Sequence, residues 1–234
     1  MFLLDRINYI LNNIFFFSDL KIWLKVIKRK KDGSTYAWAS SAIDVYILRK
    51  IIKINNPKNI LELGTGIGAS TEAMIDQMSN NANLVSLENN NYCINEVKKK
   101  LKSPLFKKKK FKIIKTNIKI CKKKINIETL IYKISQKLNV KKYDLIYIDG
   151  PSFLFKKGKF VSDLARGDIF YYYNKIKIGC IVIVDGSIIT QKEISRFCST
   201  MKNLRIFKSF TVQKVYNDKL FDTTYKKLKT WGYI

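Results

Sequence analysis

Apolar positions follow two different periods along the 234-residue chain. From about residue 57 onward, short apolar runs alternate with stretches of helical spacing. The runs are 59–63, 84–87, 111–115, 143–148 and 180–184, and the helical stretches are 69–78, 92–101, 127–138, 163–174 and 192–201. Strands that are apolar on both faces and alternate with helices are typical of a parallel sheet covered on both sides. The pattern therefore predicts an α/β fold.

The first part of the chain has a different pattern. Residues 1–32 have the spacing of one or two amphipathic helices, and a further helix is predicted over 36–54. We expect 1–35 to form a helical extension and 36–234 to form the main domain. The extension fits a lid, a homodimer contact or a contact with a membrane surface. No transmembrane segment is expected, because no run reaches the ~20 apolar residues that a span needs.

Composition adds a charge whose meaning the sequence leaves open. Lys and Arg number 45 and Asp and Glu 18, which gives a net charge of +27. Such a charge indicates a nucleic acid or an anionic surface as partner. The same excess arises when a genome of low G+C content favours Lys, Ile and Asn. The absence of histidine excludes His-based triads and His-ligated metals. Four widely spaced cysteines without a CxxC pair predict a reducing, cytoplasmic location.

The most specific motif is a glycine-rich turn directly after the first apolar run. Gly64, Gly66 and Gly68 alternate with other residues, and Glu62 stands two positions before them. Glycine permits a tight turn and a close approach of a ligand to the backbone. The spacing differs from the G-x-G-x-x-G of dinucleotide sites. A carboxylate at this position suits a cationic ligand better than a pyrophosphate.

The second apolar run ends in a carboxylate, Glu88, twenty residues past Gly68. At the end of a strand this group can accept two hydrogen bonds from a ribose diol. A glycine turn followed by an acid after the next strand is more specific than either feature alone. The pair predicts a site for a nucleoside-containing, positively charged ligand.

With these residues the chain resembles the class I S-adenosylmethionine-dependent methyltransferases. The matching segments are residues 62–68, Glu88, 143–150 and 179–185, which span most of 57–187 in the family's order. The resemblance implies a Rossmann-like, seven-stranded, mostly parallel sheet with helices on both faces. It also implies a C-terminal antiparallel β-hairpin, which Arg205–Val215 and Phe221–Lys227 would supply.

The resemblance further implies that the cofactor is S-adenosylmethionine. The glycine turn would hold its methionine part, Glu88 its ribose and Asn117 its adenine. The cofactor-binding residues that it implies are Glu62, Gly64, Thr65, Gly66, Gly68, Glu88, Asn117 and Asp149.

Within this superfamily the chain is most similar to the small-molecule and sugar O-methyltransferases, which carry Asp-Gly after strand four and Asp after strand five. Asp149 and Asp185 match these acids, and they would be catalytic, with Asp149 as the base for a hydroxyl or as its orienting group. Pro151, Ser152 and Arg166 would bind the acceptor. In metal-dependent members the two acids bind a divalent cation, so Mg²⁺ at Asp149 and Asp185 is a further expectation. Gly186 stands where those enzymes have Asn.

The predicted function is therefore transfer of a methyl group to a hydroxyl of a small molecule or of a glycan sugar. One alternative is an RNA or DNA methyltransferase that uses the basic surface. Nucleic-acid enzymes that methylate amino groups usually have an aromatic residue where this chain has Ser152. Another alternative is a non-catalytic partner protein with this fold, although the intact glycine turn and Glu88 argue against an empty site.

Overall fold

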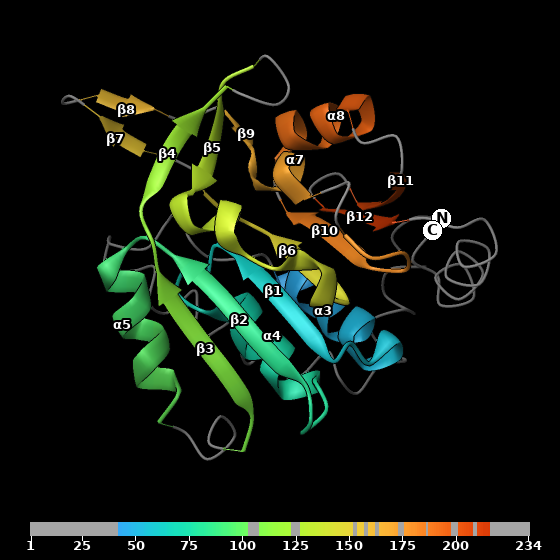
Figure 1. Ribbon diagram of the computed structural model, residues 1–234. Coiled ribbons are helices and arrows are strands. Elements are labelled where there is room, and N and C mark those ends of the chain that lie inside the picture. The colour runs from blue at the N-terminus through green and yellow to red at the C-terminus, as the bar shows by residue number, and fades with distance from the viewer. Residues whose placement is uncertain are drawn as a thin grey trace.

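The computed structural model shows an α/β fold around one large sheet (Figure 1). It describes residues 42–102, 108–122, 127–151, 154–156, 159–161, 164–172, 176–185, 187–197, 201–207 and 210–215. The predicted extension 1–35, the predicted strand 221–227 and Ser152 lie outside these ranges.

Five strands form the parallel part of the sheet. They are β1 (Asn59–Leu63), β2 (Asn83–Glu88), β3 (Lys110–Lys115), β6 (Leu145–Ile148) and β10 (Ile181–Asp185). They lie in the order β10-β6-β1-β2-β3, and every neighbouring pair is parallel. The predicted α/β fold with a mostly parallel sheet is confirmed. The strand order reverses between β1 and β6, so a ligand crevice is expected where these two strands end.

Two antiparallel strands follow β10 at the far edge of this sheet. They are β12 (Phe210–Val215), which pairs with β10, and β11 (Met201–Phe207), which pairs with β12. The stretch 205–215, expected as one strand, therefore contributes to two strands. In the β11–β12 pair, Met201 lies opposite Val215 and Phe207 lies opposite Phe210. The apolar alternation does not reveal this reversal, because both sides of it have the same strand-like pattern.

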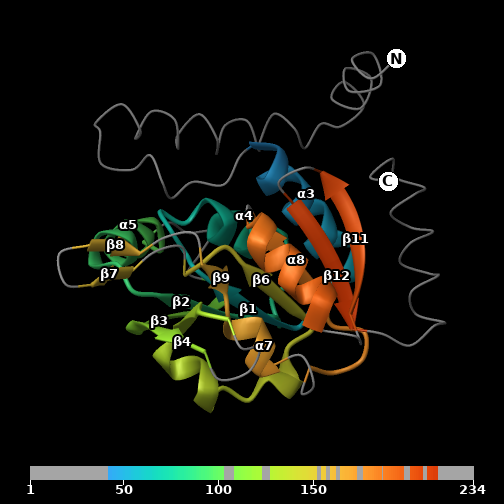
Figure 2. The same ribbon diagram turned by 90° about the horizontal axis from the view of Figure 1, so that it is seen from above.

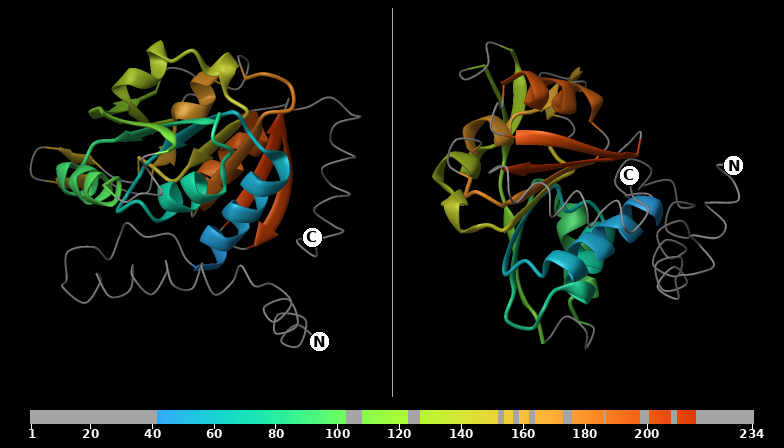
Figure 3. Two further views of the ribbon diagram at one scale, coloured as in Figure 1. Left: turned by 90° about the horizontal axis from the view of Figure 1, so that it is seen from below. Right: turned by 90° about the vertical axis from the view of Figure 1, so that its right-hand side faces the viewer.

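Helices cover both faces of the sheet. One face carries α3 (Ala42–Asn55), α4 (Ala69–Gln77) and α5 (Asn91–Lys100), and the other carries α7 (Asp168–Tyr172) and α8 (Ile188–Phe197) (Figures 2 and 3). Consecutive β1 residues face opposite layers: Ile60 packs in the core cluster under α3 and α4, and Leu61 in the cluster under α7 and α8. Burial of both faces explains why β1 is apolar from Ile60 to Leu63 apart from Glu62.

A small three-stranded sheet lies beside the carboxyl ends of the parallel strands (Figure 1). It contains β4 (Ile118–Cys121), β5 (Thr129–Tyr132) and β9 (Ala165–Arg166), with β5 antiparallel to β4 and parallel to β9. Two short 3₁₀ segments follow β5, η1 (Lys133–Lys137) and η2 (Val140–Lys142). The strands β7 (Leu154–Lys156) and β8 (Lys159–Val161) form a separate antiparallel pair.

This small sheet corrects two predicted helices. The helix expected over 127–138 is wrong, because all four residues of β5 are buried and the strand pairs on both sides. Likewise, the stretch 163–174 contains β9 and the short helix α7 instead of one long helix. In both cases pairing with distant strands decides the structure, and local apolar spacing does not show it. In the part of the chain that the structure describes, no helix is long and apolar enough to cross a membrane.

Candidate functional site

The turn after β1 is tied to the ends of both neighbouring strands by the main chain. The carbonyl oxygen of Leu63 accepts hydrogen bonds from the amides of Asp149 and Gly150, at 2.9 and 2.6 Å. The amide of Gly64 donates to the carbonyl oxygen of Leu87 at 3.0 Å. Three predicted site segments, around 64, 88 and 149, are thereby brought together.

Gly64 is required by this arrangement. Its φ is +92°, and a Cβ atom at this position would lie 2.5 Å from the amide nitrogen of Gly150. Such a separation is too short for non-bonded atoms, and the neighbour is backbone that cannot rotate away. The predicted cofactor turn therefore lies directly against the turn that carries Asp149.

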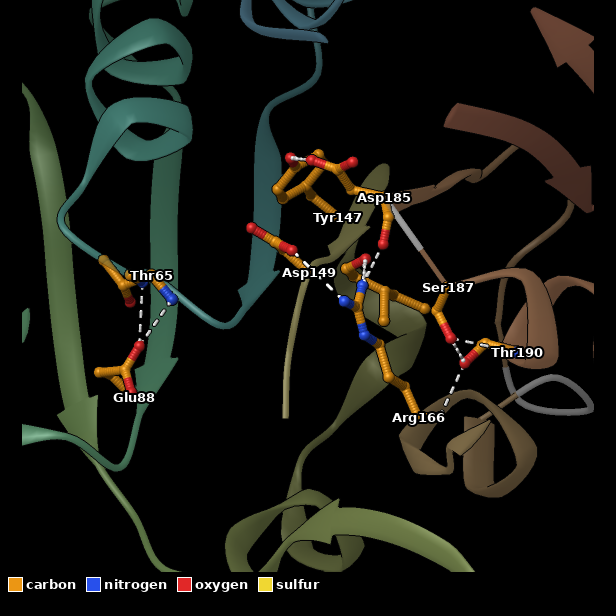
Figure 4. Close-up of polar contacts among 10 residues, drawn as sticks. Thr65, Glu88, Tyr147, Asp149, Arg166, Asp185, Ser187 and Thr190 are labelled. Atoms are coloured by element: carbon orange, nitrogen blue, oxygen red, sulfur yellow. Dashed lines mark hydrogen bonds and ion pairs between the residues drawn. The ribbon is translucent and has the colours of Figure 1, made fainter. Parts of the chain in front are cut away.

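Glu88 closes the other side of the glycine turn. Its Oε2 accepts from the amides of Thr65 and Gly66, both at 3.0 Å (Figure 4). Oε1 accepts from the amides of Asn89 and Asn90 at 2.8 and 2.9 Å. Burial raises the pKa of the Glu88 carboxyl, and these four backbone donors oppose that shift. An acceptor group is thus held at the end of β2, within hydrogen-bond distance of the turn.

Asp149 is held from its buried side by Arg166, which lies in β9. The Oδ1 atom of Asp149 is 3.5 Å from Nη2 of Arg166. The Nη1 atom of Arg166 donates to the carbonyl oxygen of Ile148 at 3.0 Å and also to that of Asp185 (Figure 4). The backbone amide of Arg166 donates to the hydroxyl of buried Thr190 at 2.8 Å. One buried side chain therefore joins the ends of β6 and β10 and contacts the carboxylate between them.

Asp185 is buried at the end of β10 and has a different partner. Its Oδ2 atom accepts a hydrogen bond of 2.5 Å from the hydroxyl of Tyr147 (Figure 4). In contrast, the side chain of Asp149 is 28% exposed. Of the two acids predicted to be catalytic, Asp149 is the one that the structure leaves accessible to an acceptor.

The two acids do not fit a divalent cation. Arg166 places positive charge beside Asp149, and Tyr147 donates to Asp185. Within the described ranges no group of three or more Asp, Glu or Cys side chains is arranged to hold a metal ion. A guanidinium competes with a cation for the same oxygen atoms. The structure therefore does not support the expected Mg²⁺.

Glu62 faces α4 and β2. Its carboxylate accepts from the hydroxyls of Ser70 and Thr71, at 2.6 and 2.7 Å, and from that of Ser86. Burial raises the pKa of Glu62 to about 7, although the three hydroxyls oppose the shift. Glu62 thus connects β1 to the first turn of α4. Its predicted contact with the cofactor stays a prediction.

The remaining predicted residues lie around these turns. Asn117 is exposed after β3, and its carbonyl oxygen accepts from the amide of Lys133 at 2.8 Å. Pro151 is buried directly after Gly150. Arg166, expected at the acceptor, is buried with its guanidinium on protein atoms. Its contact with an acceptor stays a prediction.

Two tyrosines of the site were missed by sequence reasoning. One is Tyr147, the partner of Asp185. The other is Tyr132, the last residue of β5, whose hydroxyl would lie only 2.7 Å from a Cβ atom at Gly150. Burial raises the pKa of Tyr132, and the charge of Glu88 raises it further, so its hydroxyl stays protonated at neutral pH. No sequence signal marks either residue, because a tyrosine in an apolar strand usually belongs to the core.

These features fit the cofactor that the resemblance implies. The turn at Gly64 presents backbone with left-handed φ values, and the buried carboxylate of Glu88 offers acceptor oxygens at the end of β2. Together with the order of the parallel strands, they define a class I S-adenosylmethionine-dependent methyltransferase. A family model described as ribosomal RNA adenine dimethylase matches residues 26–146, and the chain belongs to this family.

Solved structures with this fold include several methyltransferases. An O-methyltransferase from Bacillus cereus, in complex with SAH, is 14% identical, has a TM-score of 0.59 and aligns over 84% of this chain and 91% of its own. The O-methyltransferase TomG from Streptomyces achromogenes, involved in tomaymycin synthesis and in complex with SAM, is 14% identical, with a TM-score of 0.54 over 84% and 90%. SAH-bound PaMTH1 from Podospora anserina is 16% identical, with a TM-score of 0.55 over 85% and 88%. Such identities show a shared fold. No curated protein sequence matches the chain.

Proposed function

We propose that this methyltransferase acts on a hydroxyl of a small molecule or of a glycan sugar. The observation that carries the proposal is the partly exposed carboxylate of Asp149 on a turn that is hydrogen-bonded to the glycine turn. A carboxylate beside a methyl donor can take the proton of a hydroxyl acceptor. The proposal includes the seven-stranded sheet with its C-terminal hairpin that the class implies.

The chain's own groups would hold the cofactor in the turn between β1 and α4. Glu88 would accept hydrogen bonds from the ribose hydroxyls, and Asn117 would lie near the adenine. When bound, S-adenosylmethionine supplies a methyl group that its sulfonium charge has already activated. No nucleophilic side chain of the enzyme is needed for this chemistry.

Asp149 would accept the hydrogen bond of the acceptor hydroxyl and take its proton as the bond from the hydroxyl oxygen to the methyl carbon forms and the bond from that carbon to the cofactor sulfur breaks. Arg166 fixes this carboxylate from the buried side, so that its exposed part faces the acceptor in one orientation. Holding the two reacting groups in line supplies much of the rate enhancement in such reactions. Asp185, which Tyr147 holds in place, would form the adjoining wall.

The test uses Asp149→Asn and the matched control Asp144→Asn. Asp144 lies directly before β6, at its opposite end, and its side chain is 26% exposed. Radiolabelled S-adenosylmethionine would be incubated with small-molecule and glycan fractions, and cofactor affinity would be measured by calorimetry. Asp149→Asn should lower transfer by about 10²- to 10⁴-fold, as the loss of a general base does, with a much smaller loss of cofactor affinity.

Asp144→Asn should retain transfer, because Asp144 is far from the glycine turn along β6 and binds Lys177 and the amides of Lys58 and Asn59. Wild-type transfer by Asp149→Asn would contradict the proposed role of this carboxylate.

A nucleic-acid acceptor is the second candidate, because the matching family model describes ribosomal RNA adenine dimethylases. RNA would be incubated with the enzyme and radiolabelled S-adenosylmethionine, then digested to nucleosides, and the methylated atom would be identified. A methyl group on an adenine nitrogen would favour this second candidate over the hydroxyl reaction.

A further inference from the structure

Tyr132 is a buried tyrosine at the candidate site that the proposed reaction does not use. It is the last residue of β5, is only 1% exposed, and packs in the core cluster under α7 and α8. Its hydroxyl oxygen lies 2.7 Å from the point where a Cβ atom at Gly150 would stand. The Cα atom of Gly64 lies 3.0 Å from the same point. The hydroxyl is therefore located where the glycine turn meets the turn that carries Asp149.

The main chain around Tyr132 is fixed on both sides. Ile118 of β4 lies opposite Tyr132, and the backbone amide of Tyr132 donates to Oδ1 of Asp168 at 3.1 Å. On the other side, β9 packs so closely against β5 that a Cβ atom at Gly167 would lie 2.2 Å from Oγ1 of Thr129. Strand pairing and burial of the ring leave the hydroxyl little freedom to move away from the two turns.

This hydroxyl has no hydrogen-bond partner among the residues that the structure describes. The hydroxyl of Tyr147, the other tyrosine of the site, donates to Asp185. Buried hydroxyls usually have a partner, because an unsatisfied one costs free energy. A buried group that lacks a protein partner and lies at a ligand crevice indicates that its partner belongs to the ligand.

The charges around this hydroxyl suit a cationic ligand. Burial raises the pKa of Tyr132 well above its usual value. The charges of Glu88, Asp168 and Asp149 raise this pKa further, and the charge of Arg166 lowers it. The hydroxyl is therefore neutral at neutral pH and keeps lone pairs that can accept a hydrogen bond. Three carboxylates beside one guanidinium leave an excess of negative charge, which attracts a positive group.

The position of the hydroxyl selects one part of the cofactor. Glu88, the proposed ribose acceptor, binds amides of the glycine turn, and Asp149, the proposed base, directly precedes Gly150. The Tyr132 hydroxyl, at the meeting point of the two turns, lies between these carboxylates. In S-adenosylmethionine the sulfonium connects the ribose end to the methyl group that is transferred. A cofactor held by Glu88 with its methyl group toward Asp149 would bring the sulfonium to Tyr132.

We propose that the Tyr132 hydroxyl contacts the sulfonium end of the bound cofactor and thereby distinguishes S-adenosylmethionine from its demethylated product. A sulfonium polarises the C–H bonds of its methyl group, and an oxygen atom beside them accepts weak hydrogen bonds. S-adenosylhomocysteine lacks both the methyl group and the charge, so the contact would be absent in the product complex. The inference goes beyond the proposed function, since it does not depend on which acceptor is methylated.

The test measures the affinities of S-adenosylmethionine and S-adenosylhomocysteine by calorimetry, with the full chain and without an acceptor. Tyr132→Phe removes only the hydroxyl. The control is Tyr143→Phe, because Tyr143 is buried in the same core cluster but precedes β6, at the end opposite to Asp149. Tyr132→Phe should bind S-adenosylmethionine about tenfold more weakly and S-adenosylhomocysteine less than about threefold more weakly. Tyr143→Phe should bind both as the wild type does.

An equal loss of affinity for both ligands in Tyr132→Phe would overturn the proposal, because the hydroxyl would then contact a part that the two ligands share. Unchanged affinities in this variant would overturn it as well. Thermal midpoints of the wild type and the two variants would show whether the variants remain folded. Because no methyl transfer is measured, the result is independent of the proposed reaction on a hydroxyl.

A second measurement needs only the wild type and therefore also applies if Tyr132→Phe does not fold. S-adenosylmethionine with a ¹³C-labelled methyl group would be bound to the protein and studied by NMR. Cross-relaxation between the methyl protons and the ring protons of a tyrosine is expected, because those ring protons adjoin the hydroxyl. The absence of any such contact to a tyrosine ring would overturn the proposal.

Discussion

The two carboxylates that border the crevice are held in different ways. Glu88 accepts hydrogen bonds from four backbone amides, all of them within a few residues of the glycine turn or of Glu88 itself. Asp149 is held by the side chain of Arg166, which is seventeen residues away in sequence and belongs to another sheet. The cofactor half of the site is therefore built by the main chain, and the acceptor half by side chains.

This difference predicts different consequences of substitution. Backbone donors remain when neighbouring side chains change, so the cofactor half depends mainly on Glu88 and on the glycines. In the acceptor half each contact can be removed by a single substitution, at Arg166, Tyr147 or Thr190. Such a half can be adapted to different acceptors while the cofactor half stays the same.

The largest effect that this comparison predicts for cofactor binding is in Glu88→Ala. The substitution removes the proposed ribose acceptor, and the four backbone amides that donate to this carboxylate lose their acceptor. The loss of hydrogen bonds to a charged group predicts a cofactor affinity about 100-fold lower, which is about 3 kcal/mol. Calorimetric titration with S-adenosylmethionine would measure this change.

Glu88→Gln is the control, because its amide keeps one acceptor oxygen and should lose less affinity than Glu88→Ala. If both variants bind the cofactor as the wild type does, Glu88 serves only to fold the turn. The statement that the cofactor half depends mainly on Glu88 would then be wrong.

The same difference explains what the sequence could predict. The strand Asn59–Leu63 was predicted with its observed bounds. The role of Glu88 was proposed because a glycine turn followed by an acid after the next strand is a specific sequence pattern, even though the two meet across 22 to 23 residues. The clamp around Arg166 could not be predicted, since it depends on residues near 148, 166, 185 and 190 meeting in space. Similarly, the segment 129–132 has helical apolar spacing, and only its pairing with β4 and β9 makes it a strand.

Glu62 is an exception inside the cofactor half, because hydroxyl side chains hold its carboxylate. Burial raises its pKa from 4.5 to about 7, so the folded state binds more protons than the unfolded state between these values. Stability should therefore fall as pH rises through this window. Between pH 5 and pH 7, the free energy of unfolding should fall by about 2 kcal/mol less in Glu62→Gln than in the wild type.

Urea unfolding of the wild type and of Glu62→Gln at the two pH values would measure the effect. The exposed Glu128→Gln serves as the control for a changed net charge. If stability depends on pH in Glu62→Gln as it does in the wild type, another titrating group causes that dependence. Glu62 would then give no evidence of a difference between the cofactor half and the acceptor half.

The smallest effect, and the sharpest test of the comparison, is expected in Arg166→Lys. A lysine keeps the positive charge, but one ammonium group cannot reach the carbonyl oxygens of two strands and the carboxylate of Asp149 in the planar geometry of a guanidinium. We expect kcat to fall about tenfold, or about 1.4 kcal/mol, through misplacement of Asp149, while cofactor affinity stays the same. Steady-state kinetics and calorimetry would separate the two quantities, with the exposed Arg196→Lys as control. A parallel loss of cofactor affinity would mean that the clamp supports the whole crevice, and that the two halves of the site are not independent.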